Sequence, residues 1–244
     1  MFCGPKEYQL PMTLDFIGPR DWDSIKLVAF DVDGTLYRRR QLRLRMAGEI
    51  LIHTLSKWNF EIIAVLRTYR HIRERLGNEE VPNFEHALIA ETASATAHSP
   101  DAVRAMVAEW IEQRPLRHLA GCRYPILPEL FAGLRQKGKI IGILSDYPAG
   151  AKLAALGLTA DHVVCAGDEG IGLLKPHPRG LEVLIAAAGA QVDTTVLIGD
   201  RAERDGLVAR RVGARALLRS PQPIEGFQTF AQFDDELFAP FFRA

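Results

Sequence analysis

Five short apolar runs recur along the chain, and this recurrence constrains the fold more than any other feature of the sequence. The runs cover residues 25–31, 139–145, 161–167, 194–200 and 214–220. Short apolar runs without polar alternation are typical of strands that are covered on both faces of a parallel sheet. Amphipathic helical patterns at 125–139, 148–158, 178–190 and 201–214 alternate with the later runs. The sequence therefore predicts an α/β fold with a Rossmann-like, doubly wound parallel sheet.

The segment between the first and second runs has no strand pattern. It shows four amphipathic helical patterns instead, at 43–58, 60–77, 84–97 and 99–114. Ser99 and Pro100 suit the N-cap and the first position of the last of these helices. A segment of this size is too long for a loop in a compact domain. We therefore expect an all-helical domain over 40–119, inserted into an α/β core formed by 1–39 and 120–244.

Composition and charge exclude several classes of protein. Thirty Lys and Arg residues balance thirty Asp and Glu residues, so no broad attraction to nucleic acid or membranes is expected. No run reaches the roughly 18 apolar residues of a membrane helix, and the first residues lack the pattern of a signal peptide. The scattered cysteines, Cys3, Cys122 and Cys165, fit neither a disulfide framework nor a zinc site. These observations predict a cytoplasmic protein without a nucleic-acid or membrane partner. The sequence does not show the oligomeric state, and a monomer and a homodimer both remain open. The Phe-rich segment 221–242 is expected to pack on the core or to form a subunit contact.

Polar residues stand where the predicted strands end, which is where an open α/β sheet binds its ligands. Taken singly, each of these residues is common in ordinary loops and helix caps and does not by itself indicate an active site. Their order along the chain is more specific: an Asp-Val-Asp-Gly-Thr motif, a serine after the second strand, a Lys-Pro pair before a helix, and two aspartates after the fourth strand. The chemistry-bearing members of this series are Asp31, Asp33, Ser145, Lys175, Asp200 and Asp205.

This ordered series resembles the motifs of the haloacid dehalogenase-like (HAD) hydrolases, over about residues 26–218. The helical insertion resembles the C1-type cap of the phosphoglycolate-phosphatase-like branch. The resemblance implies a Mg²⁺-dependent phosphatase that hydrolyses a small phosphorylated metabolite through an aspartyl-phosphate intermediate. Asp31 would be the nucleophile and Asp33 the general acid and base, while Ser145 and Lys175 would bind the phosphoryl group. The implied metal ligands are Asp31, the backbone carbonyl of Asp33, and Asp200, with Asp205 as a further ligand or a support.

The residue types fit this chemistry. A carboxylate can attack phosphorus when a divalent cation and fixed positive groups shield its charge, and Mg²⁺ prefers oxygen ligands. Gly34 and Thr35 let the chain turn away from the strand, and their amides are expected to face the phosphate. Asp146 is expected to shape the substrate pocket. Arg39 and Arg43 are predicted to contact an anionic substrate, the alternative being a solvated helix face.

The acid at position 33 separates branches of this superfamily. Dehalogenases and phosphonate-cleaving members carry a non-acidic residue there, so Asp33 favours phosphate-ester hydrolysis or phosphoryl transfer. A phosphosugar mutase would keep the same acid and remains an alternative. A catalytically idle binding protein on the same scaffold is a second alternative, against which the complete set of charged residues argues. The sequence does not select among phosphoglycolate, a nucleotide, a sugar phosphate and pyrophosphate as the substrate.

Overall fold

The computed structural model describes residues 17–18, 20–57 and 60–242. Its centre is a sheet of six parallel strands in the order β3-β2-β1-β4-β5-β6. The five predicted strands are confirmed, and a sixth lies in the Phe-rich segment, where three residues are too few to show a strand pattern. The bounds are β1 (Leu27–Phe30), β2 (Ile140–Ser145), β3 (His162–Cys165), β4 (Thr195–Gly199), β5 (Arg215–Arg219) and β6 (Gln228–Phe230).

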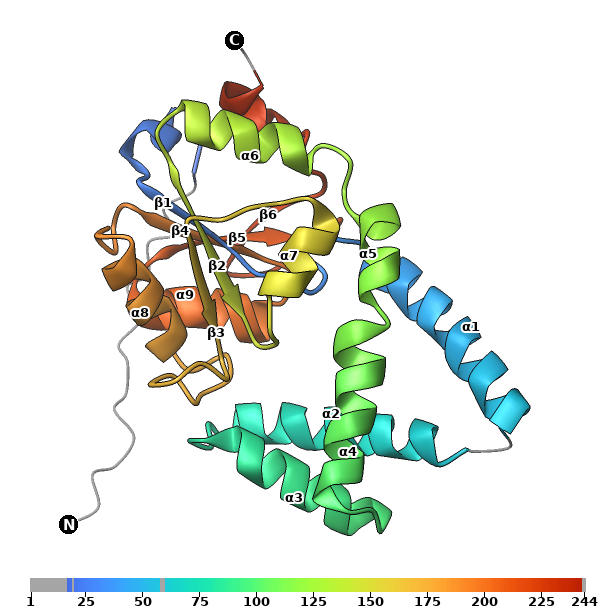
Figure 1. Cartoon of the computed structure of the whole chain (residues 1–244). Coiled ribbons are helices and arrows are strands. Elements are labelled where there is room, and N and C mark those ends of the chain that lie inside the picture. Colours follow the sequence, from blue (N-terminus) through green and yellow to red (C-terminus); the bar gives the residue numbers. More distant parts are fainter. Residues whose placement is uncertain (1–16, 19, 58–59, 243–244) are drawn as a thin grey trace, which may run out of the picture.

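Helices cover both faces of this sheet (Figure 1). On one face, Val28 and Phe30 of β1 pack with α6 (Leu127–Gln136) and α7 (Gly150–Leu156). On the other face, Leu27 and Ala29 pack with α8 (Arg179–Ala187) and α9 (Leu207–Val212). A π-helical turn, η3 (Ala202–Gly206), precedes α9. Because alternate side chains of β1 enter two different cores, the sheet is doubly wound, as the uninterrupted apolar runs predict.

The Phe-rich segment packs on the core. The short helices η1 (Asp21–Ser24) and η4 (Glu236–Phe241) meet through Trp22, whose ring centroid lies 4.9 Å from that of Phe241. The indole N–H of Trp22 donates a hydrogen bond of 2.7 Å to the carbonyl oxygen of Leu237. Phe230 of β6 meets Phe238 edge-to-face at 4.9 Å. These aromatic contacts extend the core and bury Phe230, Phe238 and Phe241, although most other residues of the segment are partly or fully exposed.

In the described residues between β1 and α6 the chain forms five helices, and we call them the helical unit. They are α1 (Arg39–Lys57), α2 (Glu61–Asn78), α3 (Phe84–Thr96), α4 (Pro100–Val107) and α5 (Leu116–Cys122), with a π-helical turn, η2 (Ala108–Gln113), after α4. The sequence predicts four helices here, and the fifth arises at Pro115, which has no N–H to continue the preceding helix. Ser99 caps α4 as predicted, accepting a hydrogen bond of 3.2 Å from the N–H of Ala102. The last helix ends three residues beyond the boundary expected at 119.

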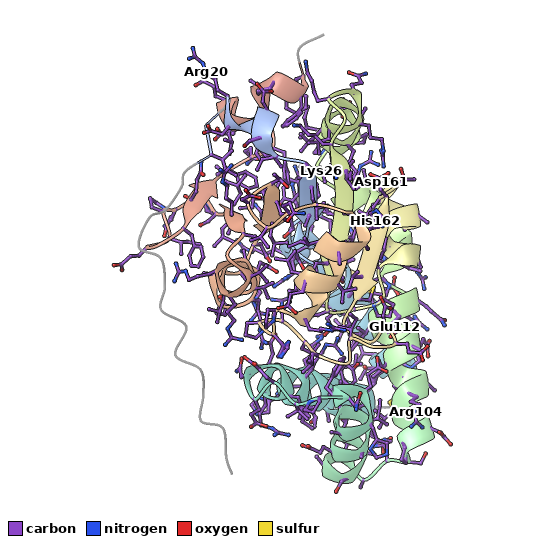
Figure 2. All side chains as sticks on the ribbon, turned by 90° about the vertical axis from the view of Figure 1, so that its left-hand side faces the viewer. Arg20, Lys26, Arg104, Glu112, Asp161 and His162 are labelled. Carbon is purple, nitrogen blue, oxygen red and sulfur yellow. The ribbon has the colours of Figure 1, made fainter. Side chains whose placement is uncertain are left out.

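The carboxyl ends of the strands face α2 and α3. Lys26 comes just before the amino end of β1, and His162 is the first residue of β3. Both lie on the side of the sheet away from these two helices (Figure 2). None of the described helices has both the length and the apolarity that crossing a membrane requires. Cys122 and Cys165 are buried free thiols, whereas Cys3 and the rest of 1–16 lie outside the described residues. The fold therefore places the polar strand ends opposite the helical unit.

Candidate active site

Asp31 lies at the centre of the polar cluster. It follows the last residue of β1, the strand between β2 and β4, and is 5% exposed. The ammonium nitrogen of Lys175 lies 2.5 Å from Asp31 Oδ1. The buried Thr35 hydroxyl donates a hydrogen bond of 3.0 Å to Asp31 Oδ2. Both carboxylate oxygens are therefore held, and the side chain is oriented before any substrate arrives.

Asp205 positions this lysine and the loop after β4. Its Oδ1 accepts a hydrogen bond of 2.6 Å from Lys175, and its Oδ2 accepts from the backbone N–H groups of Asp200 and Arg201. The carboxylate is 1% exposed. A side chain on Gly199 would not fit, because its Cβ would lie 2.3 Å from Asp205 Cβ. Asp205 thus holds Lys175 and the backbone after β4 in place through three hydrogen bonds.

Three carboxylates converge at this edge of the sheet. Oxygen atoms of Asp31, Asp200 and Asp205 lie within 4.8 Å of one another. Burial, with the charge of Asp31, raises the pKa of Asp200 to about 7. Burial and the neighbouring acids also raise the pKa of Asp31, against the opposing charge of Lys175. Oxygen donors with excess negative charge fit a hard divalent cation such as Mg²⁺.

Arg39, in the first turn of α1, brings a second cation to the cluster. Its Nη2 donates a hydrogen bond to the backbone carbonyl of Asp33 and lies 3.5 Å from Asp200 Oδ1. Burial would lower the pKa of Arg39, but the charge of Asp200 and the nearby acids raise it. Gly34, at φ 109°, leaves room for this contact, since its Cβ would lie 2.9 Å from Arg39 Nη2. The guanidinium therefore lies between two of the oxygen atoms expected to bind the metal.

Asp33 is paired with a lysine from the opposite side of the site. The ammonium nitrogen of Lys152, in α7, lies 2.6 Å from each carboxylate oxygen of Asp33. The hydroxyl of Tyr37 donates a further hydrogen bond to Asp33 Oδ1. Burial raises the pKa of Asp33, but Lys152 and Tyr37 outweigh it and hold that pKa below its usual range. Asp33 is therefore ionised at neutral pH in the ligand-free chain.

Residues after β2 link the lysine loop to the helical unit. Asp146 Oδ1 accepts a hydrogen bond of 2.9 Å from the backbone N–H of Lys175. The Asp146 carbonyl accepts a hydrogen bond from Arg73 of α2. Ser145 is 1% exposed, and its Oγ accepts a hydrogen bond of 3.2 Å from the N–H of Tyr147. The turn at 145–147 thus connects the backbone of Lys175 to α2.

A cavity of about 60 Å³ opens between the strand ends and α2. Its lining includes Asp31, Asp33, Lys175 and Asp200 from the core, and Arg73 and Glu74 from α2. Arg39 and Asp146 reach its wall. Four other residues expected at the site do not line it: Gly34, Thr35, Ser145 and Arg43, of which Arg43 is exposed on α1 and the others are buried.

Ion pairs close the cavity on its outer side. Arg204 of η3 donates hydrogen bonds to the Glu74 carboxylate at 2.7 Å and to Asn78 at 2.9 Å. Arg201 pairs with the same glutamate at 2.8 Å. Hydrogen bonds from Arg201 and Arg204 lower the pKa of Glu74 to about 2. These contacts bind α2 to the loop after β4 in a closed arrangement.

Residues of the site that were not predicted from the sequence include Tyr37, Arg73 and Lys152, and also Glu74 and Arg204. Lys152 is the single charged residue in the apolar stretch 149–158, and this isolation is a signal that could have revealed it. Arg73 also has a signal, because it comes four residues after Tyr69 and three before Leu76, so helical periodicity places it on the apolar face of α2, and the other arginines of this helix are not among its buried residues.

Comparisons with known proteins agree with the motifs and the fold. The family model described as haloacid dehalogenase-like hydrolase matches residues 25–213. A phosphoglycolate phosphatase of Rhodospirillum rubrum is 25% identical over 218 residues, which is 86% of this chain and 87% of that protein. A phosphoserine phosphatase of Thermus thermophilus is 28% identical over 143 residues, 55% of this chain and 53% of that protein. A crystal structure of 2-haloacid dehalogenase from Pseudomonas syringae pv. Tomato DC3000 superposes with a TM-score of 0.61 at 21% identity, covering 89% of this chain and 97% of that one.

Proposed function

The chain belongs to the haloacid dehalogenase-like hydrolases, and from that premise we propose that it is a Mg²⁺-dependent phosphatase acting on a small phosphorylated metabolite. The pair Asp31 and Asp33 carries the proposal. Asp31 is buried against one lysine, and a second acid stands two residues further on. A halide leaves without a proton, whereas the alkoxide of a phosphate ester needs one, so an acid at position 33 suits phosphate esters. Relatives with phosphatase names support the same reading.

The first half of the proposed reaction transfers the phosphoryl group to the protein. An oxygen of Asp31 attacks phosphorus, the bond from phosphorus to the ester oxygen breaks, and Asp33 gives its proton to the leaving alkoxide. Lys175, already 2.5 Å from Asp31, orients the nucleophile and offsets negative charge on the phosphoryl oxygens. Asp33 must be protonated for this step, and a bound phosphate favours that form because its negative charge raises the pKa of a nearby acid.

The second half returns the nucleophile to its starting form. Asp33 takes a proton from water, the water oxygen attacks phosphorus, and the bond to Asp31 breaks to release inorganic phosphate. Asp33 is already a carboxylate beside Lys152 in the ligand-free chain, which is the form that this step uses. One acid therefore gives a proton in the first step and removes one in the second.

The oxygen donors at the strand edge fit Mg²⁺, which when bound supplies positive charge to the nucleophile and the phosphoryl group. Asp31, the backbone carbonyl of Asp33 and Asp200 would hold the ion. Asp205 would support them through Lys175 and the backbone N–H groups of Asp200 and Arg201. Because Arg39 contacts the carbonyl of Asp33 and lies near Asp200, it has to move when an ion takes this position.

Residues 40–119 would act as a cap on the core of 1–39 and 120–244. The bonds from Arg73 to Asp146 and from Glu74 to Arg204 support this role, because they hold α2 over the cavity. Opening of these contacts would admit substrate, and their closure would exclude bulk water. We place the protein in the cytoplasm as a monomer or homodimer, a proposal that the buried free thiols of Cys122 and Cys165 suit.

Phosphate release tests the proposal. With Mg²⁺, the purified protein should release inorganic phosphate from an aryl phosphate or from a small phosphorylated acid, and a chelator should stop the release. Asp31→Asn should reduce the release to background, whereas Asp23→Asn, an exposed aspartate of η1, should leave it unchanged. Activity that persists in Asp31→Asn would refute the nucleophile. Isomerisation of a sugar phosphate with little phosphate release would favour a mutase instead.

A further inference from the structure

The chain leaves the core for the helical unit and returns to it through two adjacent segments, residues 36–38 and 122–124, which we call the linker pair. Tyr37 and Arg123 form an antiparallel bridge between these segments, and two backbone hydrogen bonds of 2.9 and 3.3 Å flank it. Figure 1 shows α1 and α5 side by side where they meet the core. Because the two segments are the covalent connections between the helical unit and the core, a movement of one relative to the other has to bend the chain at or beside them.

A cavity of about 350 Å³ lies beside the linker pair, and Arg38 and Tyr124 form part of its wall. Among the residues that the structure describes, none lines both this cavity and the one that holds Asp31. Ile126 and Phe233 add apolar surface, and the ring centroid of Phe233 lies 5.9 Å from that of Tyr124. Small-molecule sites are typically clefts of about 300–1,000 Å³ with an apolar, aromatic lining and a few polar groups. The cavity therefore has the size and lining of a ligand site that is separate from the proposed active site.

Charged side chains of both signs line this cavity. Arg38 precedes α1, Glu129 lies in the first turn of α6, and Asp234 follows β6. In the described part of the chain, none of these three side chains makes an ion pair. The Arg38 guanidinium carbon lies 4.9 Å from the Tyr124 ring centroid, and Nη1 donates a hydrogen bond of 3.3 Å to the carbonyl of Arg123. Since a guanidinium has five N–H groups, most of those of Arg38 stay available. A ligand in this cavity therefore meets one cation and two anions.

These charges restrict the chemistry of the ligand. A phosphate dianion would be attracted by Arg38 but repelled by Glu129 and Asp234, and a simple cation would be repelled by Arg38. A molecule with one carboxylate and one ammonium group matches both signs, and its carboxylate fits the edge of a guanidinium through two parallel hydrogen bonds. An apolar group on the same molecule would be removed from water against Ile126 and Phe233. Amino acids with apolar side chains combine these three features.

Tyr124 connects the cavity to the turn that carries Asp33. The guanidinium carbon of Arg219 lies 4.7 Å from the Tyr124 ring centroid, and Arg219 Nη2 donates a hydrogen bond of 3.1 Å to the carbonyl of Gly34. Gly34 directly follows Asp33 in the chain. Tyr124 itself belongs to the linker pair. A ligand packed on its ring therefore contacts a linker and is separated by one residue, Arg219, from the turn after β1.

We propose that this cavity binds a free amino acid with an apolar side chain, and that its occupation restrains the linker pair. Arg38 binds the carboxylate, Glu129 and Asp234 bind the ammonium group, and the apolar side chain covers Phe233. Arg38 and Tyr124 come from the two different linkers, whereas the acids come from the core. The ligand therefore holds the helical unit in the arrangement in which α2 closes the proposed active site. Slower opening lowers kcat for phosphate release, an effect that rests on the proposed function, whereas the binding does not.

Calorimetry on the full chain tests the binding. We expect L-phenylalanine and L-leucine to bind saturably. Phenethylamine, which lacks the carboxylate, and 3-phenylpropionate, which lacks the ammonium group, should each bind at least about tenfold more weakly than phenylalanine. Arg38→Gln and the double variant Glu129→Gln/Asp234→Asn should also weaken phenylalanine binding about tenfold or more. Arg40→Gln and Glu225→Gln, at exposed positions outside the cavity, should leave it unchanged.

Hydrogen exchange and phosphate release measure the restraint. With phenylalanine bound, the backbone amides of 36–38 and 122–124 should exchange more slowly. For an aryl phosphate, kcat should fall at least about twofold, without a rise in KM. In the double variant the amino acid should change neither quantity. Because Glu129 and Asp234 are exposed, this variant tests the site even where Arg38→Gln impairs folding.

The outcomes separate this inference from the proposed function. Absence of saturable binding by both amino acids would overturn the inference, and so would equal binding of the two analogues or equal binding by the double variant. Binding that leaves linker exchange and kcat unchanged would overturn the restraint. A higher KM with kcat unchanged would place the amino acid in the active site and overturn the inference as well. A wild type that releases no phosphate would overturn the proposed function alone, and calorimetry and hydrogen exchange would still decide this inference.

Discussion

Replacing Lys152 with methionine would remove the cation facing Asp33 while keeping most of the apolar stem. Lys152 is 7% exposed, and its ammonium nitrogen lies 2.6 Å from each Asp33 oxygen. Removing one partner of a buried ion pair typically costs about 3–5 kcal/mol. The Asp33 side chain is 22% exposed, so water offsets part of this cost, and we expect a loss of about 2–3 kcal/mol in unfolding free energy. The melting temperature should fall by about 4–12 °C.

The substitution should also change how stability and turnover depend on pH. Burial raises the pKa of Asp33, and Lys152 is the strongest of the groups that together hold it below its usual range. A depressed carboxylate pKa contributes stability above the pKa of the unfolded chain, and this contribution is lost as pH falls through the folded value. The stability gap between wild type and Lys152→Met should therefore be widest near neutral pH and narrow in acid. Because Asp33 is proposed to act as the base of the second step, the acidic limb of kcat should move to higher pH.

Urea unfolding followed by tryptophan fluorescence at neutral and acidic pH measures the first effect, and phosphate release against pH measures the second. Lys137→Met removes an exposed lysine after α6 and should change neither. In the Asp33→Asn background, Lys152→Met should cost less, because the carboxylate is already absent. An acidic limb that does not move in Lys152→Met would refute the assignment of Asp33 as the base. Unchanged stability at neutral pH would refute the ion pair.

Three further predictions concern the nucleophile, the metal position and the closed arrangement. Lys175→Met should lower kcat for phosphate release about 10²- to 10³-fold, since it removes the fixed charge beside the nucleophile. Arg39→Ala should tighten Mg²⁺ binding about fivefold in calorimetry, because it removes a cation whose contact with the proposed metal ligands contributes about 1 kcal/mol. Arg40→Ala, at an exposed position, should leave Mg²⁺ binding unchanged. Glu74→Gln should reduce the free energy of unfolding by at most about 1 kcal/mol, measured as a lower melting temperature, since the Glu74 carboxylate is half exposed. The hydrogen bond from Arg201 lowers the pKa of Glu74 to about 2. The difference in melting temperature between the wild type and Glu74→Gln should therefore be largest above the pKa of an unfolded glutamate and should disappear toward pH 2.

The central residues of the site were predictable because they follow strands. Asp31, Ser145 and Asp200 come at the ends of apolar runs, and parallel strands bring their carboxyl ends to one edge of the sheet. The doubly wound sheet follows from the same runs. Strand β6 was not predictable, since its three residues are too few to show a strand pattern and their pairing with β5 depends on how the Phe-rich segment packs on the core.

The remaining residues of the site depend on how elements dock. Periodicity places Arg73 on the buried face of α2, but its contact with the Asp146 carbonyl depends on where α2 docks against the core, which periodicity does not show. Lys152 reaches Asp33 because α7 packs beside the end of β1. Arg43 was expected beside Arg39 at the substrate, but four residues along α1 it is exposed and does not line the cavity.

Detection of the phosphoryl group on the protein tests the central claim most directly. The wild type would be mixed with Mg²⁺ and a phosphate ester, quenched in acid within one turnover, and digested for mass spectrometry. The account predicts a phosphoryl adduct on Asp31 in the wild type, and neither adduct nor phosphate release in Asp31→Asn. An adduct on another residue, or phosphate release by Asp31→Asn at the wild-type rate, would contradict it.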